Sequence, residues 1–364
     1  MGTLVAPGPP LAATPLWPPV RHLVGPVVDF VCVGGLSILC LGAIHLGLPL
    51  ERDVATVAWT FYYLSFVANW PHFLLSYQIL YWNYRRELLT RPRFLWAGVG
   101  APALLAGLLV AVAVTESAWG GAWLVRSMYL LVGWHYVKQA YGCFTVLSAR
   151  NRYFLTDGER RVTRGAMYAL WLLNFVGTNV DVRVADLRGV GYSLFWDWPP
   201  GLVTAATVAM AASALAMVVV LVRKAFREDA TPPLNAIVAL LSIYAWFIPA
   251  LTHRVFFYSV PFFHSLQYLL FALLLTRNRA VAQATEDGGP PRLRLATYLA
   301  TTVVLGVLAF KLVPEALDRH AGQPAADVTP TFWMFAFIWF INVHHYFIDN
   351  KLWLRDNAEM RYLK

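Results

Sequence analysis

The sequence is poor in charged residues. Of its 364 residues, only 13% are Asp, Glu, Lys or Arg, whereas 59% are hydrophobic. Soluble globular domains carry about 25% charged residues, so the composition excludes an ordinary soluble domain. It indicates a chain that crosses a lipid bilayer many times. We therefore expect a multi-pass integral membrane protein in the inner (cytoplasmic) membrane of a bacterium, where the lipid bilayer surrounds it.

Two further features are lacking. The only three cysteines, Cys32, Cys40 and Cys143, lie within apolar segments at spacings that match no metal site. We interpret them as small hydrophobic residues. The N-terminus lacks a basic segment followed by a cleavage site, so no removable signal peptide is expected. Residues 1–22 are instead predicted to form a disordered, proline-rich lead.

Long apolar runs are what the chain has in place of charge. Runs of roughly 20 residues predict transmembrane helices, and the sequence has about ten of them. We expect an all-α transmembrane bundle that forms a single domain over residues 23–353, followed by a cytoplasmic tail at 354–364. The predicted spans are 24–49, 55–82, 94–115, 122–147, 164–180, 201–222, 234–252, 255–276, 294–313 and 331–353.

Basic residues are concentrated in every second connection between these runs. The segments 83–93 and 148–164 are rich in arginine, whereas 51–53 and 116–121 are not. Because cytoplasmic loops carry the excess of Lys and Arg, the alternation predicts that both termini are cytoplasmic. The same rule accounts for the net charge of +9, so a nucleic-acid partner is not expected.

Four predicted spans carry histidine away from their ends. At 1.5 Å per helical residue, these histidines lie at depths of roughly 12 to 20 Å from the cytoplasmic ends of their spans. Buried polar groups in a bilayer mark functional sites, and neutral imidazole is the commonest metal ligand. We therefore predict that one metal or haem site is ligated by His72, His135, His264, His344 and His345.

Other polar residues lie in the same spans. Lys138 and Gln139 follow His135 by about one turn, so all three project from one helix face. A lysine inside a span needs a partner, and Asp349 is the candidate. The predicted catalytic residues are Lys138, Asp349 and Tyr136. Side chains predicted to bind the cofactor or to orient its ligands are Gln139, Gln267, Tyr268 and Asn342.

The segment Phe262-Phe263-His264-Ser265-Leu266-Gln267-Tyr268 resembles the bacterial Brp/Blh carotenoid-cleaving oxygenases. Those proteins are polytopic, and histidines from several helices hold their iron. The resemblance implies a membrane non-haem iron oxygenase. It covers this motif and the plan of mid-membrane histidines, and it departs at Tyr268, where that family has a second histidine.

Three functions are compatible with these features. The first is a membrane-embedded metal oxygenase or oxidase that uses non-haem iron, acts on a lipid-soluble substrate and has an electron donor as a further partner. His344 would then be a ligand or a proton carrier. The second is a haem-binding electron-transfer protein. The third is a transporter, in which Lys138, Asp349 and the histidines relay protons or bind a transported transition metal.

Overall fold

Each of the ten predicted ranges is largely helical, although the second is divided between two separate helices. The computed structural model describes residues 20–47, 50–178, 183–185, 191–193, 198–252, 255–324, 329–354 and 356–363. Residues 1–19 of the predicted disordered lead lie outside them. Apart from one short antiparallel pair of strands, β1 (Arg183–Ala185) and β2 (Gly191–Ser193), the regular structure in the described residues is helical, as predicted.

The helices follow the order of the predicted spans. Several of them are joined end to end by a π-helical turn at Val31–Gly35, Trp96–Gly100 or Leu308–Leu312, and another such turn extends α4 at Ile79–Asn83. The helices are α1 (Pro26–Phe30), α2 (Leu36–Gly47), α3 (Leu50–Ser65), α4 (Asn69–Gln78), α5 (Pro92–Leu95), α6 (Ala101–Thr115), α7 (Ala118–Arg150), α8 (Asp157–Thr178), α9 (Leu202–Glu228), α10 (Leu234–Thr252), α11 (Val255–Asp287), α12 (Pro291–Val307), α13 (Val313–His320), α14 (Phe332–Leu352) and a 3-10 helix at Ala358–Leu363.

Many of these helices are longer than the apolar run that predicts them, and a polar cap accounts for the extension at the start of α8. α8 begins at Asp157 rather than 164. There the Thr156 amide donates to Glu159 Oε2 (2.8 Å), and the Glu159 amide donates to Thr156 Oγ1 (3.3 Å). This reciprocal arrangement is a capping box. Similarly, α13 continues as far as His320 through a segment that hydropathy alone assigns to a loop.

The predicted second span is interrupted before its histidine. α3 ends at Ser65, and α4 begins at Asn69 with Pro71 in its first turn. A proline has no amide hydrogen, and its ring clashes with the carbonyl four residues earlier, so it fits best in the first turn of a helix. The break therefore falls just ahead of Pro71, and α4 is a separate short helix that carries His72.

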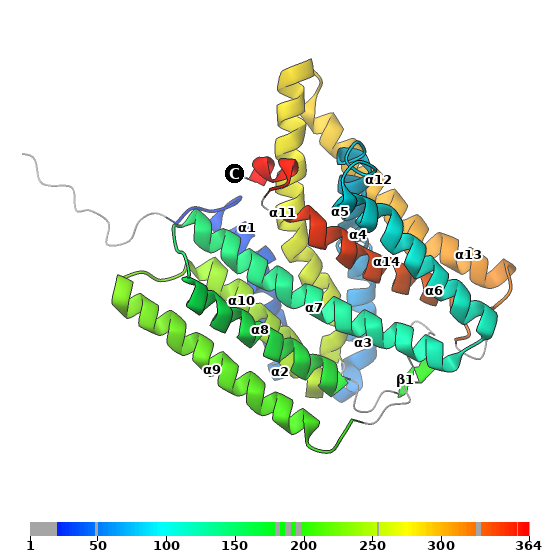
Figure 1. Cartoon of the computed structure of the whole chain (residues 1–364), viewed down its shortest axis with the longest axis horizontal. Helices are drawn as coiled ribbons and strands as arrows, with labels where there is room; N and C mark the ends of the chain where they lie inside the picture. Colours follow the sequence, from blue (N-terminus) through cyan, green and yellow to red (C-terminus); the bar gives the residue numbers. More distant parts are fainter. Residues whose placement is uncertain are drawn as a thin grey trace, which may run out of the picture.

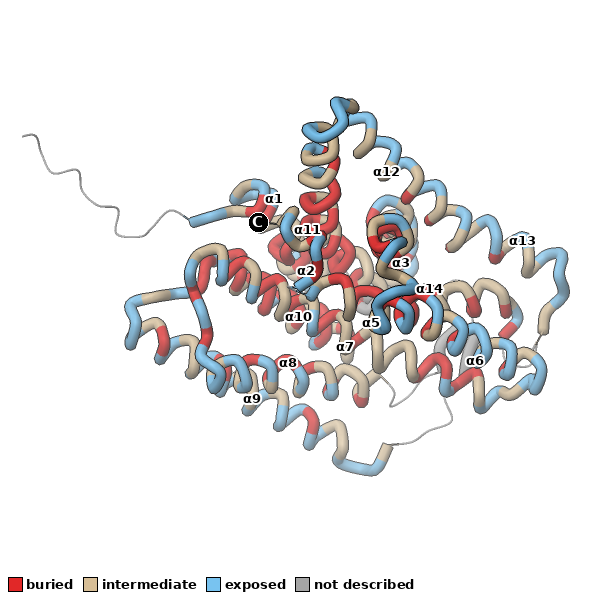
Figure 2. The backbone as a smooth tube through the Cα atoms, turned by 45° about the horizontal axis from the view of Figure 1, so that its top comes forward, coloured by how far each residue is buried: buried red, intermediate tan, exposed pale blue. Residues whose placement is uncertain are grey.

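The helices surround α11, which contacts α3, α4, α7, α10 and α12 (Figure 1). Burial follows this arrangement. Buried residues gather on α7, α10, α11 and α14, whereas α9 is mostly exposed and the α12–α13 run has mainly intermediate and exposed residues (Figure 2). In α11, 72% of the apolar window is buried, compared with 11% in α9. The centre of the bundle is thus built by helices from both halves of the sequence.

Six helical segments are long and apolar enough to cross a membrane: Pro26–Gly47, Pro92–Thr115, Leu202–Glu228, Leu234–Thr252, Tyr258–Asp287 and Pro291–His320. The protein therefore has the helices of a membrane protein. Four predicted spans do not meet the same criteria within the described residues, and three of these, formed by α3–α4, α7 and α14, carry histidine. Polar side chains lower the hydropathy of these helices.

Candidate metal centre

Four histidines from four helices meet at the centre of the bundle. They are His72 of α4, His135 of α7, His264 of α11 and His345 of α14. Each offers one ring nitrogen, and these four nitrogens all lie within 4.8 Å of one another. Three of the residues are at most 1% exposed, and the His135 side chain is 11% exposed. The structure therefore brings together four of the five predicted ligands.

The spacing of the rings fits a single ion. Nε2 of His72 lies 2.9 Å from Nε2 of His345. The ring centroid of His135 lies 4.9 Å from the ring centroid of His264 and 4.9 Å from that of His345. Nitrogens that bind one ion at about 2.0–2.1 Å stand roughly 3 to 4 Å apart. Small movements of the rings would therefore complete a mononuclear site.

The nitrogens also lack other partners. Both ring nitrogens of His264, Nε2 of His135 and Nδ1 of His345 are buried without a hydrogen bond. Most buried polar atoms in proteins are paired, and each one left unpaired costs about 1–3 kcal/mol. An ion that accepted one lone pair from each ring would give a partner to Nε2 of His135 and to one nitrogen of His264. The donor set therefore fits a metal ion, and imidazole suits iron, zinc, copper or nickel.

The orientation of His72 is fixed by Ser265, the residue after His264. Ser265 Oγ lies 3.2 Å from Nδ1 of His72 and donates to the carbonyl oxygen of Pro261 (2.6 Å). Because Oγ donates to that carbonyl, it accepts the proton of Nδ1. The lone pair of Nε2 then points into the cluster, as the outer partners of metal-bound histidines usually arrange. The prediction did not include Ser265, although it belongs to the quoted motif.

Asp349 of α14 lies directly beside the cluster. Its Oδ2 is 3.2 Å from Nε2 of His345 and 3.7 Å from Nε2 of His135. Its Oδ1 accepts hydrogen bonds from Ser76 Oγ (2.9 Å) and Tyr268 OH (3.3 Å), and these two hydroxyls also contact each other. Because Oδ1 is held by the hydroxyls, Oδ2 is directed at the imidazoles. Ser76 is a second site residue that the prediction missed.

The predicted pair between Lys138 and Asp349 is wrong. Lys138 Nζ donates instead to Oδ1 of Asn350, at 2.7 Å. Successive residues of a helix point about 100° apart. Asp349 therefore faces the histidines, while Asn350 faces Lys138 on α7. Lys138 and Asp349 lie at similar depths in their predicted spans. A similar depth does not make two side chains meet, because each must also point toward the other around its own helix.

Two predicted glutamines brace the helix that carries His264 rather than the rings. Gln139 Nε2 donates to the backbone carbonyl of His264 (2.9 Å) and to Gln267 Oε1 (3.4 Å). Gln267 Nε2 donates to the carbonyl of Val33 and to Ser242 Oγ (3.0 Å). Gly34 lets this region close, because a Cβ there would lie 2.3 Å from that of Ser242, and its φ is +140°.

The two predicted tyrosines contact the rings through their faces and edges. The ring of Tyr268 lies edge-on to His72, with centroids 4.6 Å apart. The ring of Tyr136 lies over His264, with centroids 4.1 Å apart and a tilt of 36°. Aromatic rings at these distances hold imidazoles by packing. Tyr268 also reaches Asp349, so it contacts both the ligands and the carboxylate.

His344 and Asn342 are not brought to the cluster. His344 Nε2 lies 2.7 Å from the carbonyl oxygen of Ala97, which can only accept, so Nε2 carries the proton. Its Nδ1 then accepts from Tyr77 OH, also at 2.7 Å. Both nitrogens of His344 are thus occupied. Asn342 donates to Ile338 O of its own helix. The two predictions fail because these residues point to other sides of α14.

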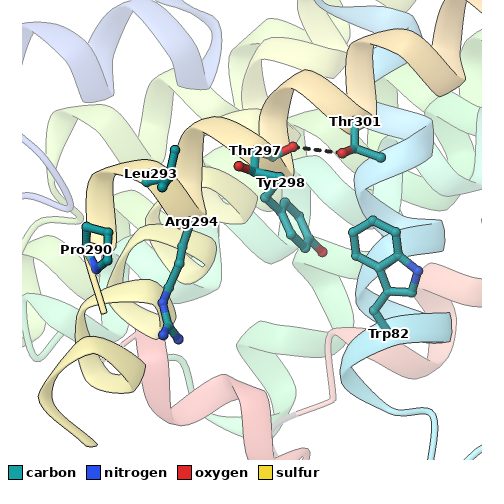
Figure 3. A pocket seen from close by; sticks show the side chains of 7 residues that line it. All are labelled: Trp82, Pro290, Leu293, Arg294, Thr297, Tyr298 and Thr301. Atoms are coloured by element: carbon teal, nitrogen blue, oxygen red, sulfur yellow. Dashed lines mark hydrogen bonds between the residues drawn. The ribbon is translucent and has the colours of Figure 1, made fainter. Parts of the chain in front are cut away.

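A cavity of about 300 Å³ opens beside the cluster. His135, Tyr268 and Asp349 form one part of its wall, and Met360 and Leu363 from the C-terminal segment form another. A second cavity, of about 420 Å³, lies between Trp82 and α12 and is lined by no histidine (Figure 3). Of these two cavities, the first is therefore the one from which a small molecule would reach the cluster.

Comparison of the chain with models of protein families, with curated proteins and with solved structures finds no match.

Proposed function

We propose that this chain is a membrane-embedded non-haem iron oxygenase or oxidase that acts on a lipid-soluble substrate. The observation that carries the proposal is the buried group of four imidazoles, several with unpaired nitrogens, beside a mainly apolar cavity. His72, His135, His264 and His345 would hold the iron, and Asp349 would orient two of them or add a carboxylate ligand. The motif around His264 favours iron among the metals that imidazole suits.

Bound iron would supply redox chemistry with O2 as the oxidant. Insertion of one oxygen atom also consumes two electrons and two protons, so an electron donor is required as a partner. The residues of the chain would hold the ligands in place, exclude bulk water and position the substrate. The 300 Å³ cavity reaches His135 and Asp349 directly, which fits the place of a substrate.

The topology belongs to the same proposal. We infer that the chain crosses the bacterial inner membrane ten times, with both termini in the cytoplasm. Ten helices or helical runs in the predicted ranges support the number, and the basic residues in alternate connections support the orientation. On this topology the C-terminal segment, which lines the cavity, faces the cytoplasm, where an electron donor would be available.

The geometry disfavours haem. Two axial histidines on opposite faces of a haem must leave the whole area of the porphyrin free between them. Here four ring nitrogens lie within 4.8 Å of one another, so His135 and His264 would occupy the space that the macrocycle needs if His72 and His345 were axial. A small ion fits the same space.

Metal analysis of the purified protein tests the proposal. We expect about one iron per chain by mass spectrometry and no Soret band in the absorption spectrum. His264→Ala should abolish iron binding, whereas His45→Ala, an exposed histidine of α2 outside the cluster, should retain it. A Soret band would establish haem instead. Protein that neither contains iron nor takes it up when reduced iron is added would exclude the proposed activity.

A further inference from the structure

Among the described residues that line the cavity beside the cluster, Lys138 is the one with a cationic side chain. Its ammonium donates to the neutral amide of Asn350 at 2.7 Å. Among the described residues, no carboxylate oxygen lies within 4 Å of its Nζ, and the nearest anionic group in the cavity wall, Asp349, is turned toward the histidines. Lys138 is an exposed residue of α7, and it has no anionic partner among the described residues, whereas charged residues within membrane spans are usually paired.

The remainder of the cavity wall is mostly apolar. From Lys138, α7 continues along the cavity through Gly142, Cys143 and Val146, and other helices add Phe271 and Trp353. The C-terminal segment contributes Leu354, Met360 and Leu363. The cavity thus has one positive charge, one helical turn from His135, and an apolar surface that leads away from the histidines toward the C-terminus.

Such a cavity matches an amphiphile with a single anionic group. We infer that it binds a long-chain carboxylate, with the carboxylate between the Lys138 ammonium and the Asn350 amide and the hydrocarbon chain along the apolar wall. This inference rests on the proposed function for the statement that the ligand is the substrate. The geometry of Lys138 and the cavity supports it independently of which metal the histidines hold.

A carboxylate fits better than a phosphate for reasons of charge and donors. The cavity offers one ammonium and one amide, which match a monoanion, whereas phosphate sites usually use arginine forks or several donors. The volume of about 300 Å³ lies at the lower end of the range for small-ligand sites. A single unbranched chain therefore suits it better than a bulky ring system.

Equilibrium binding to the full-length protein in phosphatidylcholine nanodiscs tests the inference. Radiolabelled dodecanoate is displaced by unlabelled dodecanoate, by dodecan-1-ol or by dodecyl phosphate, at a pH that keeps the carboxylate ionised. Hydrogen bonds to charged groups are worth about 1.5–3 kcal/mol, so dodecanoate should compete at least about tenfold better than the alcohol. Equal competition by the alcohol, or specific binding of dodecyl phosphate alone, would overturn the inference.

Two variants locate the charge responsible. Lys138→Met should lose the preference for dodecanoate over dodecanol. Lys351→Met removes the same charge from α14 at a residue that does not line the cavity, so it should keep the preference. If Lys138→Met still prefers the carboxylate, the assignment is wrong. Should Lys138→Met fail to fold, Lys138→Gln is measured in its place, and the comparison of head groups on the wild-type protein decides by itself.

Metal content separates this inference from the proposed function. Iron-loaded protein without any preference for the carboxylate would refute the inference and leave the proposed function standing. Protein that contains no iron but binds dodecanoate through Lys138 would do the opposite. Lys138→Met should retain its metal, because Lys138 contacts Asn350 and not a histidine.

Discussion

Two mostly apolar helices, α9 and α14, lie in opposite surroundings: α9 is rich in Ala, Val and Leu and lies at the outside of the bundle, whereas α14 is rich in aromatic residues and lies at its centre. α9 (Leu202–Glu228) meets the criteria for a membrane span, whereas α14 does not, yet only 11% of the apolar window of α9 is buried. α14 (Phe332–Leu352) carries His344, His345 and Asp349, all at most 5% exposed. In water the apolar helix would be the buried one. The reversal is what a lipid solvent requires, because exposed apolar surface is then stable and polar groups must find partners inside.

The central helix α11 shows that apolarity and a polar interior can coexist in one segment. It is apolar enough to cross a membrane, and 72% of that window is buried. Its polar residues His264, Ser265 and Gln267 are at most 1% exposed. Ser265 and Gln267 are hydrogen-bonded to neighbouring helices, which offsets the cost of burying them, whereas the ring nitrogens of His264 have no hydrogen-bond partner.

The largest effect is expected from the polar side of α14. His345→Ala removes one of the four predicted ligands, so metal binding should fall to background. Even the loss of a residue that only hydrogen-bonds to a ligand lowers metal affinity by about 10- to 100-fold. His344→Ala is the matched control on the adjacent residue. It strands the Ala97 carbonyl and Tyr77 hydroxyl and should lower stability by about 1–3 kcal/mol, but the metal should remain.

Metal content and melting temperature are measured on both variants. If His344→Ala loses the metal as completely as His345→Ala does, then His344 is a ligand after all. The orientation of α14 described above would in that case be wrong.

A charged residue introduced on the exposed surface of α9 tests whether that apolar surface faces lipid. Leu215 lies near the middle of this helix and is 65% exposed. If that surface faces lipid, Leu215→Asp should disfavour membrane insertion of the α9 segment by about 2.5–3.5 kcal/mol. Glycosylation mapping of the segment measures the inserted fraction, with Leu215→Ala as the control. Unchanged insertion of the Asp variant would mean that α9 does not face hydrocarbon.

Much of this arrangement is predictable from the sequence. The ten helical ranges follow from hydropathy, because bilayer thickness fixes the length of a span. The meeting of His72, His135, His264 and His345 follows from their similar depths. Depth does not reveal the direction in which a side chain points around its helix. The predictions that His344 and Asn342 belong to the metal site, and that Asp349 pairs with Lys138, are wrong for this reason. Serines also escape prediction, since Ser76 and Ser265 resemble the many serines that bond only to their own helix.

The smallest effect is expected where a central helix meets an outer one. Thr302 of α12 is fully buried, and its hydroxyl lies 2.5 Å from Gln78 Oε1 of α4 and 2.8 Å from the carbonyl oxygen of Tyr298 in its own helix. Hydrogen bonds between membrane helices contribute about 0.6 kcal/mol on average and up to about 1.7. Thr302→Val should therefore lower the free energy of unfolding by about 1 kcal/mol, because it removes this bond and leaves the buried Gln78 oxygen without its donor.

Thr301→Val provides the control for that change on the same helix. Its hydroxyl donates to Thr297 O of its own helix at 2.8 Å and lies at the cavity of Figure 3. Its loss should change stability by less than about 0.5 kcal/mol. Reversible unfolding in mixed micelles measures both variants, and both should keep their metal. Equal destabilisation by the two substitutions would show that α12 is held by apolar packing alone, and that the Gln78–Thr302 contact adds nothing to the attachment of this outer helix.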